Sequence, residues 1–179
     1  ECQRILDISN QKQSTAKVLF RLKPGIDADT HDYIKTGHDD SKFGLSLSDA
    51  LPLIQTTISH ANTKFLGIHA HIGSQITDQS PYLDLITWLV NAMVTIHHTT
   101  GKPIKELNCG GGFGIPYLDE DPFMDIPTII QHMVTELINQ CKYHNQPQPH
   151  IIFEPGRSII ANAGLTLYSV GAIKPISPT

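Results

Sequence analysis

Apolar positions along the chain form short continuous runs that alternate with longer stretches at helical spacing. Four of the short runs predict strands, because they are rich in β-branched or aromatic residues and each ends in a turn or a polar signature. The predicted strands cover residues 18–20, 65–72, 104–109 and 151–153. A polar loop over residues 27–41 is expected after the first strand.

Helical spacing of apolar residues predicts a helix after each of the first three strands. We place the start of the first helix at about Asp49, because this keeps Pro52 in the first turn, where proline is tolerated. The second helix has Ser80 as its expected N-cap and Pro81 at its first helical position. The third helix is expected to begin near Pro127.

Strands and helices therefore alternate, and each connection is long enough for a parallel crossover. This order predicts an α/β fold with a parallel sheet, and four such strands make half of an eight-stranded (β/α)8 barrel. Barrel enzymes carry their active sites at the C-terminal ends of the strands. In this chain the predicted strand ends carry Arg21, the segment 69–75, the glycines of 110–114 and the segment 154–157.

The last apolar run, residues 165–173, alternates with polar residues and is expected to leave the barrel for an antiparallel sheet. The predicted organisation is thus a partial barrel over residues 1–164 and the start of a β domain over residues 165–179. The chain begins with Glu1 rather than Met. We expect it to be cut from a longer protein, since a half barrel leaves open sheet edges.

Charge and cysteine content narrow the class of protein. The net charge is −4 and the thirteen basic residues are scattered, which argues against a nucleic-acid or membrane surface as partner. Cys2, Cys109 and Cys141 are odd in number and irregularly spaced, and the sequence shows no secretory leader. This favours reduced thiols and predicts a cytoplasmic protein.

The glycine cluster CGGGFG, residues 109–114, follows the third predicted strand. Glycines let backbone N–H groups approach an anion closely, so the cluster fits a phosphate cradle. Its spacing does not match the dinucleotide fingerprint. A tight turn that simply requires glycine is the alternative.

His69 and His71 are two residues apart on a predicted strand, so both project from the same face. They could form a zinc pair, as in metal-dependent amidohydrolases, or one imidazole could lie flat against a cofactor ring while Ser74 donates to a phosphate. Either could also be a core histidine. We predict no metal, because the later strand ends offer glycines and Glu-Pro-Gly-Arg instead of further ligands.

Glu154 follows three apolar residues and is expected at the rim of the barrel. A pyridine nitrogen would be a suitable partner, since a carboxylate stabilises its protonated form. The turn at Gly156 allows Arg157 to face the same site and to pair with a phosphate or a carboxylate. A Glu154–Arg157 ion pair is the alternative. Arg21 either lies close to the cofactor or forms a salt bridge within the barrel.

Taken together, RLKPGID, SKFG, GIHAHIGSQ, NCGGGFGIPY and FEPGRSIIANAG resemble the motifs of the fold-type III, alanine-racemase-like decarboxylases that use pyridoxal 5′-phosphate (PLP). The resemblance runs from about Val18 to Ile173. HIGSQ and GGGFGIPY favour the diaminopimelate branch over ornithine-type relatives. Lys23, where Asn is common, and Cys109, where an apolar residue is more usual, are minor departures.

The resemblance implies that the chain is the C-terminal half of the barrel, with PLP held at the strand ends. The implied cofactor-binding residues are Arg21, His71, Ser74, Gly111, Gly112, Glu154, Gly156 and Arg157. Among these, His71 would stack on the PLP ring and Glu154 would pair with the pyridine nitrogen, which gives both a catalytic role. Arg157 would also contact the substrate carboxylate.

The implied reaction is decarboxylation of meso-2,6-diaminopimelate to L-lysine and CO2 in a homodimer. The alternatives are a related decarboxylase of another basic amino acid or polyamine precursor, and a non-catalytic PLP-binding protein of the same fold. The family's Schiff-base lysine and its C-terminal Cys and Tyr site residues lie outside this segment. We therefore expect the segment to be inactive by itself.

Overall fold

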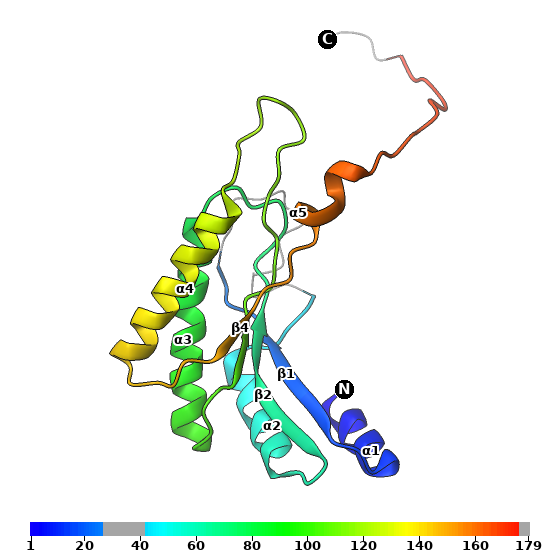
Figure 1. The fold of residues 1–179 in the computed structure, drawn as a ribbon. Helices are drawn as coiled ribbons and strands as arrows, with labels where there is room; N and C mark the ends of the chain where they lie inside the picture. Colours follow the sequence, from blue (N-terminus) through cyan, green and yellow to red (C-terminus); the bar gives the residue numbers. More distant parts are fainter. Residues whose placement is uncertain (27–41, 176–179) are drawn as a thin grey trace.

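The computed structural model describes residues 1–26 and 42–175 and contains one four-stranded sheet (Figure 1). The strands follow one another in chain order across the sheet, and each neighbouring pair is parallel. They are β1 (Ala16–Leu22), β2 (Thr63–Ala70), β3 (Glu106–Asn108) and β4 (His150–Ile152). This confirms the predicted parallel α/β order, while the polar loop predicted over residues 27–41 lies outside the described residues.

Helices connect the strands and flank the sheet. They are α1 (Cys2–Lys12), α2 (Leu47–Ser59), α3 (Ser80–Thr100), α4 (Ile126–Tyr143) and the short α5 (Arg157–Ile160), which continues into a 3-10 turn, Ala161–Ala163. The sequence analysis did not predict α1. Only Leu6 and Ser9 of this helix are buried, so its apolar pattern is weak.

Two predicted helix starts were wrong by one to three residues. The Ser46 hydroxyl, not Asp49, caps α2 by accepting the Asp49 N–H at 3.1 Å, which places Pro52 in the second turn. The proline is exposed there, so the carbonyl that loses its helical partner can be hydrated. In α3 the N-cap is Gln79 and Ser80 is the first helical residue. The start of α4 agrees with the prediction, with Asp125 as N-cap and Pro127 in the first turn.

The hydrophobic core lies between the sheet and helices α2, α3 and α4. Every second strand residue points into it, as expected for the alternation of side chains along a strand. The residues on this side are Phe20, Leu22, Ile68, Ala70 and Leu107 of the strands, and Cys109 directly after β3. The opposite face of the same strands carries Arg21, His69 and Asn108, and it is this face that bears the polar site.

The strand predicted over residues 165–173 does not form. Residues 164–175 have no regular structure and extend away from the sheet (Figure 1). Their apolar side chains are exposed, with Leu165 at 96% and Ile173 at 82%. A strand requires hydrogen bonds from a neighbour, and nothing in the described part of the chain pairs with this segment. The division into a barrel part and a β domain stays a prediction.

Candidate active site

The polar strand ends lie in two rows across the sheet because the strands are parallel and in register. In the first row, Arg21 of β1 is paired with His69 of β2, and His69 with Asn108 of β3. In the second row, the Glu154 N–H donates to the Gly110 carbonyl at 2.7 Å. Residues from four separated motifs are thus brought together at one edge of the sheet.

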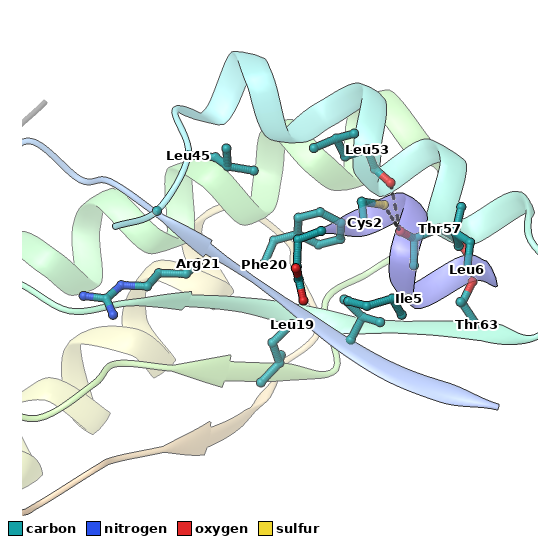
Figure 2. A pocket seen from close by; sticks show the side chains of 13 residues that line it. Cys2, Ile5, Leu6, Leu19, Phe20, Arg21, Leu45, Leu53, Thr57 and Thr63 are labelled. Atoms are coloured by element: carbon teal, nitrogen blue, oxygen red, sulfur yellow. Dashed lines mark hydrogen bonds between the residues drawn. The ribbon is translucent and has the colours of Figure 1, made fainter. Parts of the chain in front are cut away.

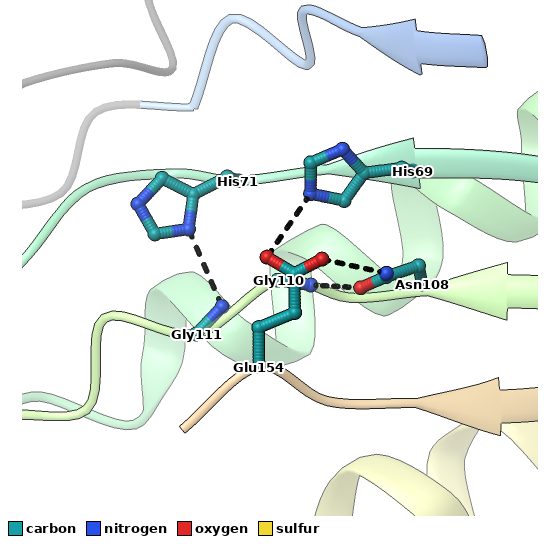
Figure 3. Close-up of polar contacts among 6 residues, drawn as sticks. All are labelled: His69, His71, Asn108, Gly110, Gly111 and Glu154. Carbon is teal, nitrogen blue, oxygen red and sulfur yellow. Dashed lines mark hydrogen bonds and ion pairs between the residues drawn. The ribbon is translucent and has the colours of Figure 1, made fainter. Parts of the chain in front are cut away.

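The Glu154 carboxylate is held by one firm hydrogen bond. The side-chain amide of Asn108 donates from Nδ2 to Glu154 Oε1 at 2.8 Å, and His69 Nε2 lies 3.8 Å from Oε2. Figure 3 shows the carboxylate between the two histidines, His69 and His71, and Asn108. The Glu154 side chain is 52% exposed, so it remains accessible to a molecule bound at the strand ends.

Both His69 of β2 and His71, the residue just after β2, favour the neutral form. Burial lowers the pKa of His69 and of His71, and the Arg21 guanidinium lowers both further, while Glu154 opposes the shift. His71 Nδ1 accepts the Gly111 N–H at 3.3 Å, so its proton is on Nε2. His69 Nε2 is buried and makes no hydrogen bond within the described residues.

The glycine turn is packed backbone against backbone. A Cβ on Gly111 would lie 2.1 Å from the Glu154 carbonyl oxygen, and one on Gly112, whose φ is +92°, would lie 2.1 Å from that of Gly73. Phe113 anchors the turn by stacking on Tyr82 of α3, with ring centroids 4.8 Å apart. Glycine is therefore required at both positions by the close approach of other main-chain atoms.

Arg157 joins two loops at the other end of the site. Its Nη2 donates to Ser74 Oγ at 3.1 Å and its Nη1 donates to the Tyr117 hydroxyl. The guanidinium carbon also lies 5.7 Å from the centre of the Tyr117 ring. The alternative of a Glu154–Arg157 ion pair was wrong, since the described residues contain none and each side chain has other partners.

The two remaining predicted residues lie at the margins. Gly156 precedes α5, and a Cβ there would have no atom within 4 Å. Arg21 places its guanidinium carbon 5.3 Å from the centre of the Phe43 ring. Its charge lowers the pKa of both His69 and His71.

The sequence analysis assigned no role to three residues that shape the site: Asn108, Gln75 and Tyr117. Gln75 donates to the Ile115 carbonyl at 2.6 Å and accepts the Ile115 N–H at 3.3 Å, so its amide pairs with the loop like a strand. The available signal was their position inside the quoted motifs NCGGGFGIPY and HIGSQ. Their partners, 40 or more residues away, are visible only in the fold.

An apolar cavity of about 420 Å³ lies elsewhere, between α1, β1 and α2 (Figure 2). Cys2, Leu6, Phe20 and Leu53 line it, and the Cys2 thiol is 3.8 Å from the Thr57 hydroxyl. Arg21 also lines it, whereas His69, His71 and Glu154 do not. The cavity therefore reaches the polar strand ends only at Arg21.

No group of three or more His, Cys, Asp or Glu side chains within 1–26 and 42–175 is placed to hold a metal ion. Among the helices that the structure describes, none combines the length and the apolar character needed to cross a membrane.

Comparison with known proteins points to one family. The family model for the pyridoxal binding domain of pyridoxal-dependent decarboxylases matches residues 1–161. The diaminopimelate decarboxylase of Halalkalibacterium halodurans is 37% identical over 98% of this chain and 40% of that protein. The chain thus spans about 40% of the length of the curated relatives that it matches.

Solved structures agree. Helicobacter pylori diaminopimelate decarboxylase complexed with L-lysine matches with a TM-score of 0.76 at 28% identity, over 89% of this chain and 38% of that one. The M. jannaschii diaminopimelate decarboxylase in complex with L-lysine matches with a TM-score of 0.71 at 34% identity, over 88% and 36%. The predicted family resemblance and the predicted fold, a part of this barrel, are confirmed.

Proposed function

This chain belongs to the pyridoxal-dependent decarboxylases, and from that membership we propose that its strand ends hold PLP in an enzyme that decarboxylates diaminopimelate. The observation that carries the proposal is the Glu154 carboxylate, fixed by Asn108 and still half exposed, beside the neutral His71 imidazole. A carboxylate and a flat neutral ring at one strand-end site are what a pyridine ring requires.

The described residues fit PLP at both of its ends. Glu154 would face the pyridine nitrogen and His71 would lie against the ring. At the phosphate end, the Ser74 hydroxyl and the Arg157 guanidinium are already joined at 3.1 Å, and Arg157 Nε is buried without a hydrogen-bond partner in the described residues. Gly111 and Gly112 would contribute main-chain atoms near the phosphate, with Gly111 packed against Glu154 and its N–H donated to His71.

When bound, PLP supplies the electron-accepting ring that makes loss of an α-carboxylate feasible. The residues of this chain would tune that ring. Glu154 would keep a proton at the pyridine nitrogen, because a carboxylate next to that atom favours its protonated form. His71, held by the Gly111 N–H, would shield one face of the ring from water. Ser74 would donate a hydrogen bond to the phosphate, and Arg157 would offset part of its negative charge.

Diaminopimelate is the proposed substrate, with L-lysine and CO2 as products. The relatives named diaminopimelate decarboxylase and the two related structures that contain L-lysine support this choice. Arg157 could pair with a substrate carboxylate in fork geometry. A homodimer and a cytoplasmic location are part of the proposal.

The test is a decarboxylation assay on the protein expressed from its complete reading frame and supplied with PLP. We expect meso-diaminopimelate to release CO2 and L-lysine in equal amounts, and we expect His71→Ala to weaken PLP binding and slow turnover. Release of CO2 from lysine or ornithine instead would favour a related decarboxylase. PLP binding without turnover of any amino acid would favour the non-catalytic alternative.

A further inference from the structure

We propose that Asn108 is a positioning residue, which orients the Glu154 carboxylate and fixes its distance from the glycine turn. This inference rests on the proposed function and deepens it. The sequence gives Asn108 no obvious role, since it is one polar residue between apolar neighbours at the end of β3. The structure places it between the two parts of the site that would hold opposite ends of PLP.

The amide of Asn108 makes two hydrogen bonds in opposite directions. Its Oδ1 accepts the Gly110 N–H at 2.9 Å, and its Nδ2 donates to Glu154 Oε1 at 2.8 Å (Figure 3). Only an amide offers an acceptor and a donor at these two places. A carboxylate of the same shape would keep the bond from Gly110 and lose the one to Glu154.

Burial shows which partner positions the other. Asn108 is 7% exposed, whereas the Glu154 side chain is 52% exposed. The main-chain N–H of Gly110 holds the buried amide in one orientation, and the amide then orients the more exposed carboxylate. Without this bond, an exposed glutamate could adopt other rotamers with little cost.

The main chain adds a second link between the same two elements. The Glu154 N–H donates to the Gly110 carbonyl at 2.7 Å, and Gly111 packs directly against the Glu154 carbonyl. The positions of the Glu154 side chain and of its backbone are therefore both fixed relative to the glycine turn. A fixed spacing matters here, because the pyridine nitrogen and the phosphate of PLP are themselves at a fixed spacing.

Asn108→Asp tests the proposal in the protein expressed from its complete reading frame. The variant keeps the size of the side chain and the acceptor for Gly110, but it places a second carboxylate against Glu154. We expect kcat to fall about 10- to 100-fold, the loss expected for one hydrogen bond to a charged group, with KM changed less. The visible absorbance of bound PLP should shift, since it reports protonation of the ring. Asn139→Asp, which adds the same charge on the exposed side of α4, should change neither quantity.

The double variant Asn108→Asp/Glu154→Gln distinguishes loss of the proposed contact from a general folding defect. It restores one donor and one acceptor at this contact with their positions exchanged, so we expect the unfolding midpoint to return toward that of the wild type. Turnover should stay as low as in Glu154→Gln alone, because both changes act through one carboxylate.

The outcomes separate the two proposals. A wild-type protein that neither binds PLP nor decarboxylates any amino acid would overturn the proposed function, and this inference with it. An active wild type whose Asn108→Asp variant keeps kcat within twofold and an unchanged absorbance would overturn the role of Asn108 alone. Multiplicative losses in the double variant would also overturn it.

Discussion

The two faces of the sheet use alternate residues of the same strands for different purposes. On the helix side, Phe20, Ile68 and Leu107 are buried in an apolar core. On the other side, His69 and Asn108 are polar: the Asn108 amide donates to the Glu154 carboxylate, and His69 Nε2 lies 3.8 Å from the same carboxylate. Adjacent residues of one strand therefore serve different purposes: one packs in the core and the next contributes to the polar site.

The forces on the two faces also differ. Burial on the helix side is non-directional and scales with the apolar area removed from water. The polar side depends on a few directed contacts between Asn108, Glu154, His71 and the glycine turn. Substitutions on the first face should cost stability, whereas those on the second should mainly cost cofactor binding and turnover.

Leu107→Ala should produce the largest effect, on stability. The side chain is fully buried between β3 and the helices, and its truncation should lower the free energy of unfolding by about 3–5 kcal/mol. Urea unfolding measures this change. Leu118→Ala, at a leucine that is 60% exposed, is the matched control and should stay within about 0.5 kcal/mol of the wild type.

Glu154→Gln should give the opposite result, a loss of turnover with the fold intact. We expect kcat to fall about 10²- to 10³-fold, because the amide carries no charge to favour a protonated pyridine nitrogen. PLP binding should be retained, and the urea midpoint should change little because the side chain is half exposed. Steady-state kinetics with a parallel PLP titration measures both, and unchanged turnover would contradict the role given to Glu154.

Gly111→Ala should affect both properties at once. Its Cβ would lie 2.1 Å from the Glu154 carbonyl oxygen, and we expect about 1–3 kcal/mol of destabilisation together with weaker PLP binding. Gly164→Ala is the matched control, because a Cβ at that position would meet only the Ala161 carbonyl oxygen, at 3.9 Å, which is an ordinary contact. If both variants bind PLP and unfold alike, the close packing of the glycine turn does not shape the site.

The smallest expected effect is a pH dependence of stability. Burial holds the pKa values of His69 and His71 below 6.5 in the folded protein, so the unfolded chain binds more protons as the pH falls through 6.5. The free energy of unfolding should therefore be highest above this pH and decrease below it. Urea unfolding at pH 7.5 and at pH 5.5 tests the sign. His69→Gln should reduce the difference in unfolding free energy between the two pH values. His98→Gln, on the exposed end of α3, should leave that difference unchanged.

Local sequence patterns predicted much of the fold because they depend on neighbours in the chain. Apolar runs located the strands, and the helix start near Pro127 agrees with the cap at Asp125. The start of α2 was missed because the analysis relied on Pro52, whereas a side-chain cap at Ser46 decided it. The strand predicted over residues 165–173 needs a partner strand, which a local pattern cannot supply.

The site was predictable where a residue belongs to a motif and not where its role depends on register. His71, Glu154 and the glycines stand out by type and position, and the fold brings them together. Asn108 acts only because the register of β3 places it between His69 and the end of β4. No spacing along the chain contains that information.

The most direct test of the central claim is a titration of the protein with PLP and, separately, with pyridoxal, which lacks the phosphate. If the polar strand ends hold the cofactor, PLP should bind at least about tenfold more tightly, as expected for charge-assisted bonds to a phosphate. Arg157→Ala should remove most of that difference. Equal affinity for the two compounds, or no binding of either, would contradict the assignment of this face of the sheet as the PLP site.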